Sequence, residues 1–246
     1  MGKKNEKKWE DMNELLAMAG SNLNILEEEV DVKVQKEYFE LIDKLSKAPD
    51  DYELLCKQHI ENINDLFEPA IEENIKKEML VVLATIDDVS IYRSIENFAK
   101  QEGALQKWAI IALQQSRMLI QSTLLDDPGV FISTGLGGQG SLLRYFCVFL
   151  NRTGHPLPDF QQNIIKNETS AAITPFKGVI EQMEFQPDYT TMILLLPLDI
   201  DLKTVFEGII DECNQYGNFL HENMIITNVK KLSEEEIRDI LKAKKE

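Results

Sequence analysis

The sequence has few of the residues that mark exported, membrane-spanning or metal-binding proteins. It holds three cysteines and three histidines among 246 residues. None of its apolar runs approaches the roughly 18–20 residues of a membrane helix, and its charged beginning, MGKKNEKKWEDMNELL, lacks the apolar core of a signal peptide. We therefore expect a cytoplasmic protein, not inserted in a membrane, whose widely separated Cys56, Cys147 and Cys213 are reduced and buried.

Positive charge is also scarce. The chain has 26 Lys and Arg against 42 Asp and Glu, which gives a formal net charge of −16. Because affinity for nucleic acid comes mostly from cationic contacts with phosphate, such an acidic surface disfavours it. The composition therefore predicts no direct binding of nucleic acid.

Catalytic and metal-binding patterns are missing as well. His59, His155 and His221 stand alone, and none has a metal-ligand spacing to another histidine or cysteine. The sequence contains no G-x-S-x-G motif, and no cysteine lies in a recognisable nucleophile setting. We therefore predict no catalytic residue, no metal site, no cofactor and no enzymatic activity.

The first half of the chain has the periodicity of helices. Apolar residues form a helical stripe over 8–29, and further amphipathic segments are predicted at 51–67 and 69–87 and after Gly103. Trp108 is the largest side chain of this half, and we expect it to be buried at the last helix interface.

Two segments of this half share a pattern, DD followed by IENI at 50–63 and DD followed by IENF at 87–98. Their spacing is about that of a helix-pair repeat, and the segment KWAIIAL at 107–113 resembles the second helix of a HEAT or armadillo-like repeat. This resemblance covers roughly residues 34–125. It implies stacked antiparallel helix pairs that offer a surface to protein partners. A plain helical bundle has the same periodicity and is the alternative.

The second half alternates strands and helices after the breakers Pro128 and Gly129, which predict domains at 1–127 and 128–246. Strands are predicted at 130–134, 142–150, 178–185, 190–196 and 224–229, and helices begin near 158, 201 and 233. A buried helix is the alternative for 142–150, but its aromatic and β-branched composition favours a strand. Without its first strand the order is β-α-β-β-α-β, that of a ferredoxin-like sandwich. The predicted fold class is therefore α+β, a helical-repeat-like array followed by a ferredoxin-like sandwich with an extra N-terminal strand.

Two local details of this half are also predicted. Along 178–185 the side chains of odd-numbered residues should share one face and those of even-numbered residues the other. Ser233 and Glu236 have the spacing of a capping box, with Leu232 and Ile237 as a hydrophobic staple.

The glycine-rich segment at 135–140 is the most unusual local feature. GLGGQG matches G-x-G-x-x-G and follows a predicted strand, but a helix should come next in a dinucleotide site. We expect instead a hairpin of the strands at 130–134 and 142–150, with these glycines at its tip. Candidate partner- or ligand-binding residues are the four glycines and a nearby cation: Gly135, Gly137, Gly138, Gly140 and Arg144.

These observations favour a non-enzymatic scaffold or regulatory module that binds another protein. One alternative is a sensor of a small anionic metabolite at the glycine-rich segment. A second alternative is an enzyme with its site at the junction of the two halves.

Overall fold

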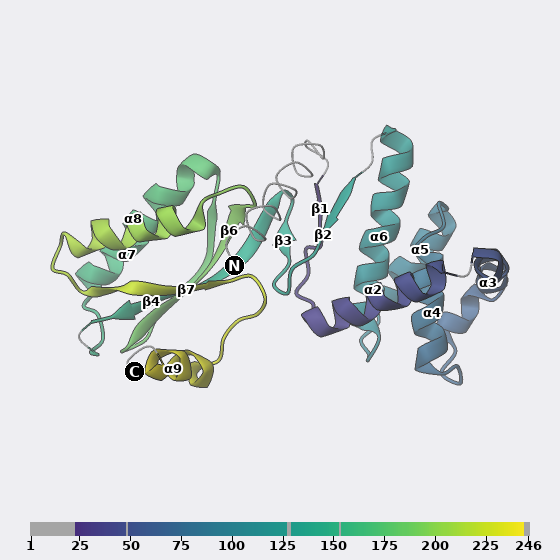
Figure 1. Ribbon diagram of the computed structural model, residues 1–246, viewed down its shortest axis with the longest axis horizontal. Helices are drawn as coiled ribbons and strands as arrows, with labels where there is room; N and C mark the ends of the chain where they lie inside the picture. Colours follow the sequence, from purple (N-terminus) through teal and green to yellow (C-terminus); the bar gives the residue numbers. More distant parts are fainter. Residues whose placement is uncertain (1–22, 48, 127–128, 153, 244–246) are drawn as a thin grey trace. The chain divides into compact units, whose positions relative to one another are not determined.

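The computed structural model describes residues 23–47, 49–126, 129–152 and 154–243 (Figure 1). The chain divides into two compact units, Met1–Ser133 and Thr134–Glu246. The predicted α+β class is confirmed, since helices fill most of the first unit and an antiparallel sheet organises the second. Residues 8–22 of the predicted first helical stripe lie outside the described residues.

The amphipathic segments predicted at 51–67 and 69–87 and after Gly103 each contain a helix, and two further helices form. The described helices of the first unit are α2 (Val32–Ser46), α3 (Pro49–Glu61), α4 (Glu73–Leu83), α5 (Val89–Ala99) and α6 (Gln106–Leu125), with a 3₁₀ turn at Ile63–Phe67 between α3 and α4. Asp31 and Asp88 cap α2 and α5, because each carboxylate accepts a backbone N–H of the first turn. The HEAT-like repeat itself stays a prediction.

The core of the first unit gathers around α6. Trp108 is 4% exposed, as predicted, and its ring lies 5.5 Å from that of Tyr38 on α2. The ammonium group of Lys77 lies 4.6 Å from the centre of the same indole ring, which is a cation–π contact. α6 thus packs against both α2 and α4.

A small parallel sheet corrects two predictions for this unit. β1 (Leu23–Ile25) pairs with β2 (Val130–Ile132), and the N–H of Leu26 donates to the carbonyl of Ile132 at 2.8 Å. The helical stripe predicted over 8–29 is therefore wrong at Leu23–Ile25. The predicted pairing of 130–134 with 142–150 is also wrong, because β2 takes its partner from the other end of the unit.

The second unit contains the larger sheet. Its elements are β3 (Gly138–Gln139), β4 (Leu142–Asn151), α7 (Asp159–Ile173), a 3₁₀ turn (Thr174–Phe176), β5 (Val179–Phe185), β6 (Tyr189–Pro197), α8 (Leu202–Asn214), β7 (Leu220–Thr227) and α9 (Glu234–Ala243). The strands β7, β4, β6 and β5 lie side by side in that order, all antiparallel, and β3 adds two residues beside the start of β4. From β4 to β7 the order is the predicted β-α-β-β-α-β.

The two faces of this sheet are covered differently (Figure 1). α7 and α8 cover one face, where the ring of Phe149 on β4 lies 6.0 Å from that of Phe206 on α8. α9 lies on the opposite face, where Ile237 packs against Phe146 and Val148. Because neighbouring residues of β4 point to opposite faces, this strand serves both layers and is almost wholly buried.

No helix within the described parts of the chain combines the length and the apolarity that crossing a lipid bilayer requires.

Candidate functional site

We call the side of the large sheet that α7 and α8 leave uncovered the open face. Alternate residues of β4 and β6 give it an apolar surface. Five of them belong to one buried cluster with Leu136 and Ile237: Phe146, Val148, Leu150, Tyr189 and Ile193. An apolar sheet face has to be buried against something, so we asked what covers each part of this one.

A bulge in β5 decides which of its side chains reach the open face. Ile180 pairs with Leu194, but the next paired residue, Gln182, lies opposite Ile193, so Glu181 is an extra residue. Cross-strand partners share a face, and Gln182 therefore lies on the open face with Ile193. The prediction that Ile180 and Gln182 share a face is wrong for this reason.

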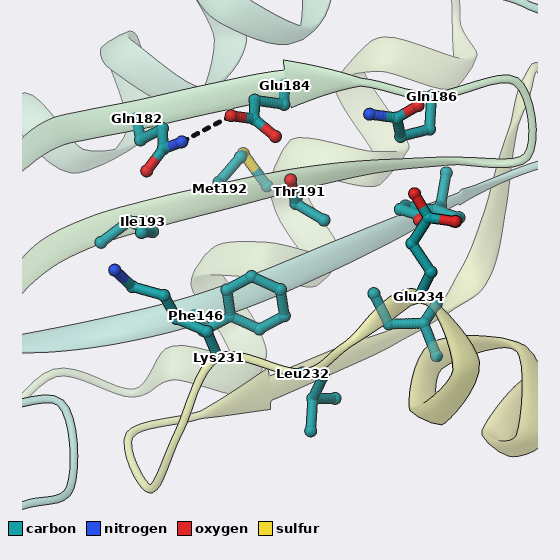
Figure 2. Close-up of a pocket in the computed structure, with 12 residues that line it drawn as sticks. Phe146, Gln182, Glu184, Gln186, Thr191, Met192, Ile193, Lys231, Leu232 and Glu234 are labelled. Carbon is teal, nitrogen blue, oxygen red and sulfur yellow. Dashed lines mark hydrogen bonds between the residues drawn. The ribbon is translucent and has the colours of Figure 1, made fainter.

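A cavity of about 220 Å³ lies over the open face between β5 and the C-terminal segment. Figure 2 shows one wall built from β5, the other from residues at and just before the start of α9, and an apolar floor between them. The walls are Gln182, Glu184 and Gln186 on one side and Lys231, Leu232 and Glu234 on the other. Two separate parts of the chain thus direct polar groups over one apolar floor.

The capping box and the hydrophobic staple predicted at the start of α9 hold the second wall in place. The N–H of Glu236 donates to the hydroxyl of Ser233 at 3.3 Å, and the N–H of Ser233 donates to the carboxylate of Glu236 at 3.0 Å. This is a complete capping box. Leu232 and Ile237 pack in the same apolar cluster and fasten the start of α9 to the sheet. Glu234 is thereby held at the cavity.

Tyr189 is the most buried polar side chain among the cavity-lining residues, at 4% exposed. Burial raises the pKa of its phenol, and the negative charge of Glu234 raises it further. Asp188 and Glu184 act in the same direction, and Arg238 opposes them. The hydroxyl of Tyr189 therefore lies in a negative field with contributions from both walls.

Two other cavities fit a ligand site less well. One of about 330 Å³ lies between α2, α3 and α4, and its lining is apolar except for Ser46 and the bonded hydroxyls of Tyr52 and Thr85. Another of about 360 Å³ is a more open groove between α7 and α8, edged by Glu168 and Glu212. Ligand sites combine an apolar lining with a few convergent polar groups, and the open-face cavity fits this description best.

The glycine-rich segment serves packing and a turn. A Cβ on Gly135 would lie 1.6 Å from the carbonyl oxygen of Val229, so only glycine allows the backbones to approach this closely. Gly140 has a φ of +58° in the two-residue turn that joins β3 to β4. The glycines thus close a hairpin, but its first strand is β3 and not 130–134 as predicted. A strand follows them where a dinucleotide site needs a helix.

The other two candidate glycines take part in the same local structure. Gly138 pairs with Leu143 across the β3–β4 hairpin. Gly137 donates its N–H to the carbonyl of Thr134 at 3.2 Å, and its carbonyl accepts the N–H of Arg144 at 2.9 Å. A binding role for these glycines stays a prediction.

Arg144, predicted as an anion-binding cation, is engaged within the protein. Its guanidinium forms two hydrogen bonds with the carboxylate of Glu181, at 2.5 and 2.9 Å, and donates to the carbonyl of Leu136 at 2.9 Å. The bonds from Arg144 lower the pKa of the Glu181 carboxyl. This pair ties the loop before β3 to the bulge of β5.

The three histidines have different surroundings. His59 is buried on α3 and contacts the carboxylate of Glu78 at 3.2 Å, whereas His155 and His221 are exposed in the second unit. Within the described residues, no group of three or more His, Cys, Asp and Glu side chains is arranged to hold a metal ion.

Sequence reasoning missed the residues that line the open-face cavity. No sequence motif marks Glu184 or Tyr189, and the sequence around Glu234 indicates only the start of a helix. The usable signal was the polar alternation of Gln182, Glu184 and Gln186 beside an apolar strand. It would have identified a half-exposed sheet face, but not the segment that faces it.

Comparisons with known proteins found likenesses in structure alone. No protein-family model matches the sequence, and no curated protein matches it. One similar structure is described as a transposase of Deinococcus radiodurans, 14% identical, with a TM-score of 0.33, and the match spans 42% of this chain and 89% of that one. Another is a REP-associated tyrosine transposase bound to a REP hairpin, also 14% identical, with a TM-score of 0.31, and the match spans 39% of this chain and 61% of that one.

These matches contradict the functional predictions made from composition and motifs. The neighbours are transposases, which are enzymes, and one of them is bound to a REP hairpin. We therefore withdraw the predictions of a non-enzymatic scaffold, of no enzymatic activity and of no direct nucleic-acid binding. The description as a HEAT-like or ferredoxin-like protein-binding scaffold is withdrawn with them. At these identities and TM-scores we assign no activity to this chain from its neighbours.

Proposed function

We propose that the second unit binds a small organic molecule in the open-face cavity. The observation that carries this proposal is the convergence of polar side chains from β5 and from the C-terminal segment over one apolar floor. A pocket with an apolar floor and a few convergent polar groups is the usual form of a small-molecule site.

The size of the cavity limits the ligand. At about 220 Å³ it is smaller than the ~300–1,000 Å³ pockets that hold drug-sized molecules. The expected ligand is therefore a small metabolite and not a folded partner.

The apolar floor and the polar walls contribute differently to ligand binding. Phe146 and Ile193, both nearly fully buried, present an aromatic ring and an aliphatic side chain to the ligand body. Gln182 and Glu184 are joined by a hydrogen bond of 2.5 Å, which orients the carboxylate along the wall. Apolar contact then supplies affinity, and the wall supplies orientation.

A fragment screen by two-dimensional ¹H–¹⁵N NMR on the full chain tests the proposal. We expect fragments that shift the resonances of cavity residues, and we expect Thr191→Trp, which fills the cavity from its floor, to abolish those shifts.

Val179→Trp is the matched control, because Val179 is an exposed residue of β5 outside the cavity lining. Its spectrum should respond to the same fragments as the wild-type spectrum does. A screen without cavity shifts, or hits that persist in folded Thr191→Trp protein, would refute the proposed function.

A further inference from the structure

We propose that the open-face cavity selects ligands that carry a positively charged nitrogen, received by the hydroxyl of Tyr189 between the carboxylates of Glu184 and Glu234. This inference rests on the proposed function, since it names the class of molecule that the same cavity takes.

The first argument is an unused hydroxyl group. Tyr189 is 4% exposed and lines the cavity, and no described residue forms a hydrogen bond with its hydroxyl. The hydroxyl lines the cavity, and a phenol can both donate and accept a hydrogen bond. A ligand nitrogen at this position would supply the missing hydrogen bond.

The second argument is the sign of the field around that hydroxyl. Glu234 on one wall, Glu184 on the other and Asp188 each contribute negative charge to its surroundings, and Arg238 contributes positive charge. The net charge of these four groups is negative. A cationic group gains from this field, and an anionic group is repelled.

Neither Arg238 nor Gln182 neutralises the wall carboxylates of Glu184 and Glu234. Arg238 contacts Glu234 at 3.5 Å, and more than half of each side chain is exposed. Exposed ion pairs of this kind contribute little. Glu184 accepts a hydrogen bond from the amide of Gln182, which carries no charge. The negative charge of both carboxylates is therefore largely available to a ligand.

The third argument is that the sign of the charge differs between the two ends of the cavity. Figure 2 shows Lys231 at the end near Gln182 and Glu234 at the end near Gln186. The positive charge of Lys231 acts on Glu181, whose carboxyl pKa it helps to lower. A cationic group is therefore favoured at the Glu234 end, with an apolar body lying over Phe146 and Ile193 toward the middle.

Three probes of one size test this selection. Phenethylamine, 2-phenylethanol and phenylacetate share a ring and differ mainly in charge, positive, neutral and negative at pH 7. NMR titration of the full chain should give a dissociation constant for the amine about tenfold lower than that for the alcohol. Phenylacetate should bind more weakly than either of the other two.

Variants assign the preference to the named carboxylates. Glu184→Gln and Glu234→Gln should each reduce the preference for the amine over 2-phenylethanol about two- to fivefold, as for exposed ion pairs. Glu235→Gln is the matched control, because this exposed neighbour on α9 carries the same charge outside the cavity lining. Its amine preference should equal that of the wild type.

The outcomes separate the two proposals. Equal binding of all three probes, abolished by Thr191→Trp, would refute charge selection and leave the ligand cavity standing. An amine preference that survives both glutamine variants would also refute it. Absence of cavity binding by every probe would refute the selection of amines, and the fragment screen alone then decides the proposed function.

Discussion

Gly135→Ala tests whether the close contact between the loop before β3 and the chain after β7 holds the open face together. The added Cβ would lie 1.6 Å from the carbonyl oxygen of Val229, 2.5 Å from its carbonyl carbon and 3.0 Å from its Cα. All three are backbone atoms, so no side chain can turn away, and the two backbones have to separate.

The expected loss of stability follows from the contacts that this separation breaks. The N–H of Leu136 donates to the carbonyl of Asn228 at 3.0 Å, and the Leu136 side chain is fully buried on the open face. Exposing a buried leucine costs about 1.5–3 kcal/mol, and one backbone hydrogen bond contributes about 0.5–1.5 kcal/mol. We expect the second unit to lose about 2–4 kcal/mol of unfolding free energy in total.

The assay must follow the second unit by itself, because the two units need not unfold together. Both tryptophans, Trp9 and Trp108, belong to the first unit. Tryptophan fluorescence therefore follows the first unit in urea, and amide hydrogen exchange of β4 follows the second. Gly135→Ala should lower the exchange protection of β4.

Gly208→Ala is the control for this substitution. A Cβ on Gly208, in the middle of α8, meets no atom within 4 Å, so alanine should raise the stability by about 0.5–1 kcal/mol. A change in β4 protection of less than about 0.5 kcal/mol in Gly135→Ala, the range of an ordinary surface substitution, would refute the reasoning.

Three further predictions concern stability and reactivity. Trp108→Ala should cost the first unit about 3–5 kcal/mol in urea melts followed by circular dichroism, and a loss below about 1 kcal/mol would contradict its place in the core. Burial raises the pKa of the Cys147 thiol, so Ellman's reagent should modify half-buried Cys56 first, and early modification of Cys147 in folded protein would contradict this. Arg144 lowers the pKa of Glu181, so the folded carboxyl releases its proton more readily than the unfolded one. The resulting stability is full above about pH 4.3, the unfolded value, and is lost as the pH falls through the lowered folded pKa. Urea melts between pH 3 and pH 7 should show this loss in the wild type and a smaller one in Arg144→Met.

The second unit was the more predictable part of the fold. The β-α-β-β-α-β order follows from apolar alternation and turn residues, and the strand at 142–150 follows from its aromatic and β-branched composition. The capping box at Ser233 and Glu236 is a contact between residues three apart, so their spacing alone fixed it.

Strand partners were less predictable. Leu23–Ile25, where Asn24 lies between two apolar residues, and Val130–Ile132 are short runs, and the first suits a helix or a strand equally well. Which one forms depends on whether a partner lies alongside to take up the backbone N–H and carbonyl groups. That partner lies at the other end of the first unit, and no periodicity within either run could identify it.

The sequence by itself determined the element order, the caps and the apolar stripes, because each depends on residues a few positions apart. Only the tertiary structure decided the cavity. The bulge at Glu181 turned Gln182 to the open face, and the packing of Ile237 in the apolar cluster placed Glu234 at the cavity that Glu184 and Tyr189 also line. A site made of side chains from separate segments exists only once those segments are packed, because its geometry depends on distances that the local sequence does not encode.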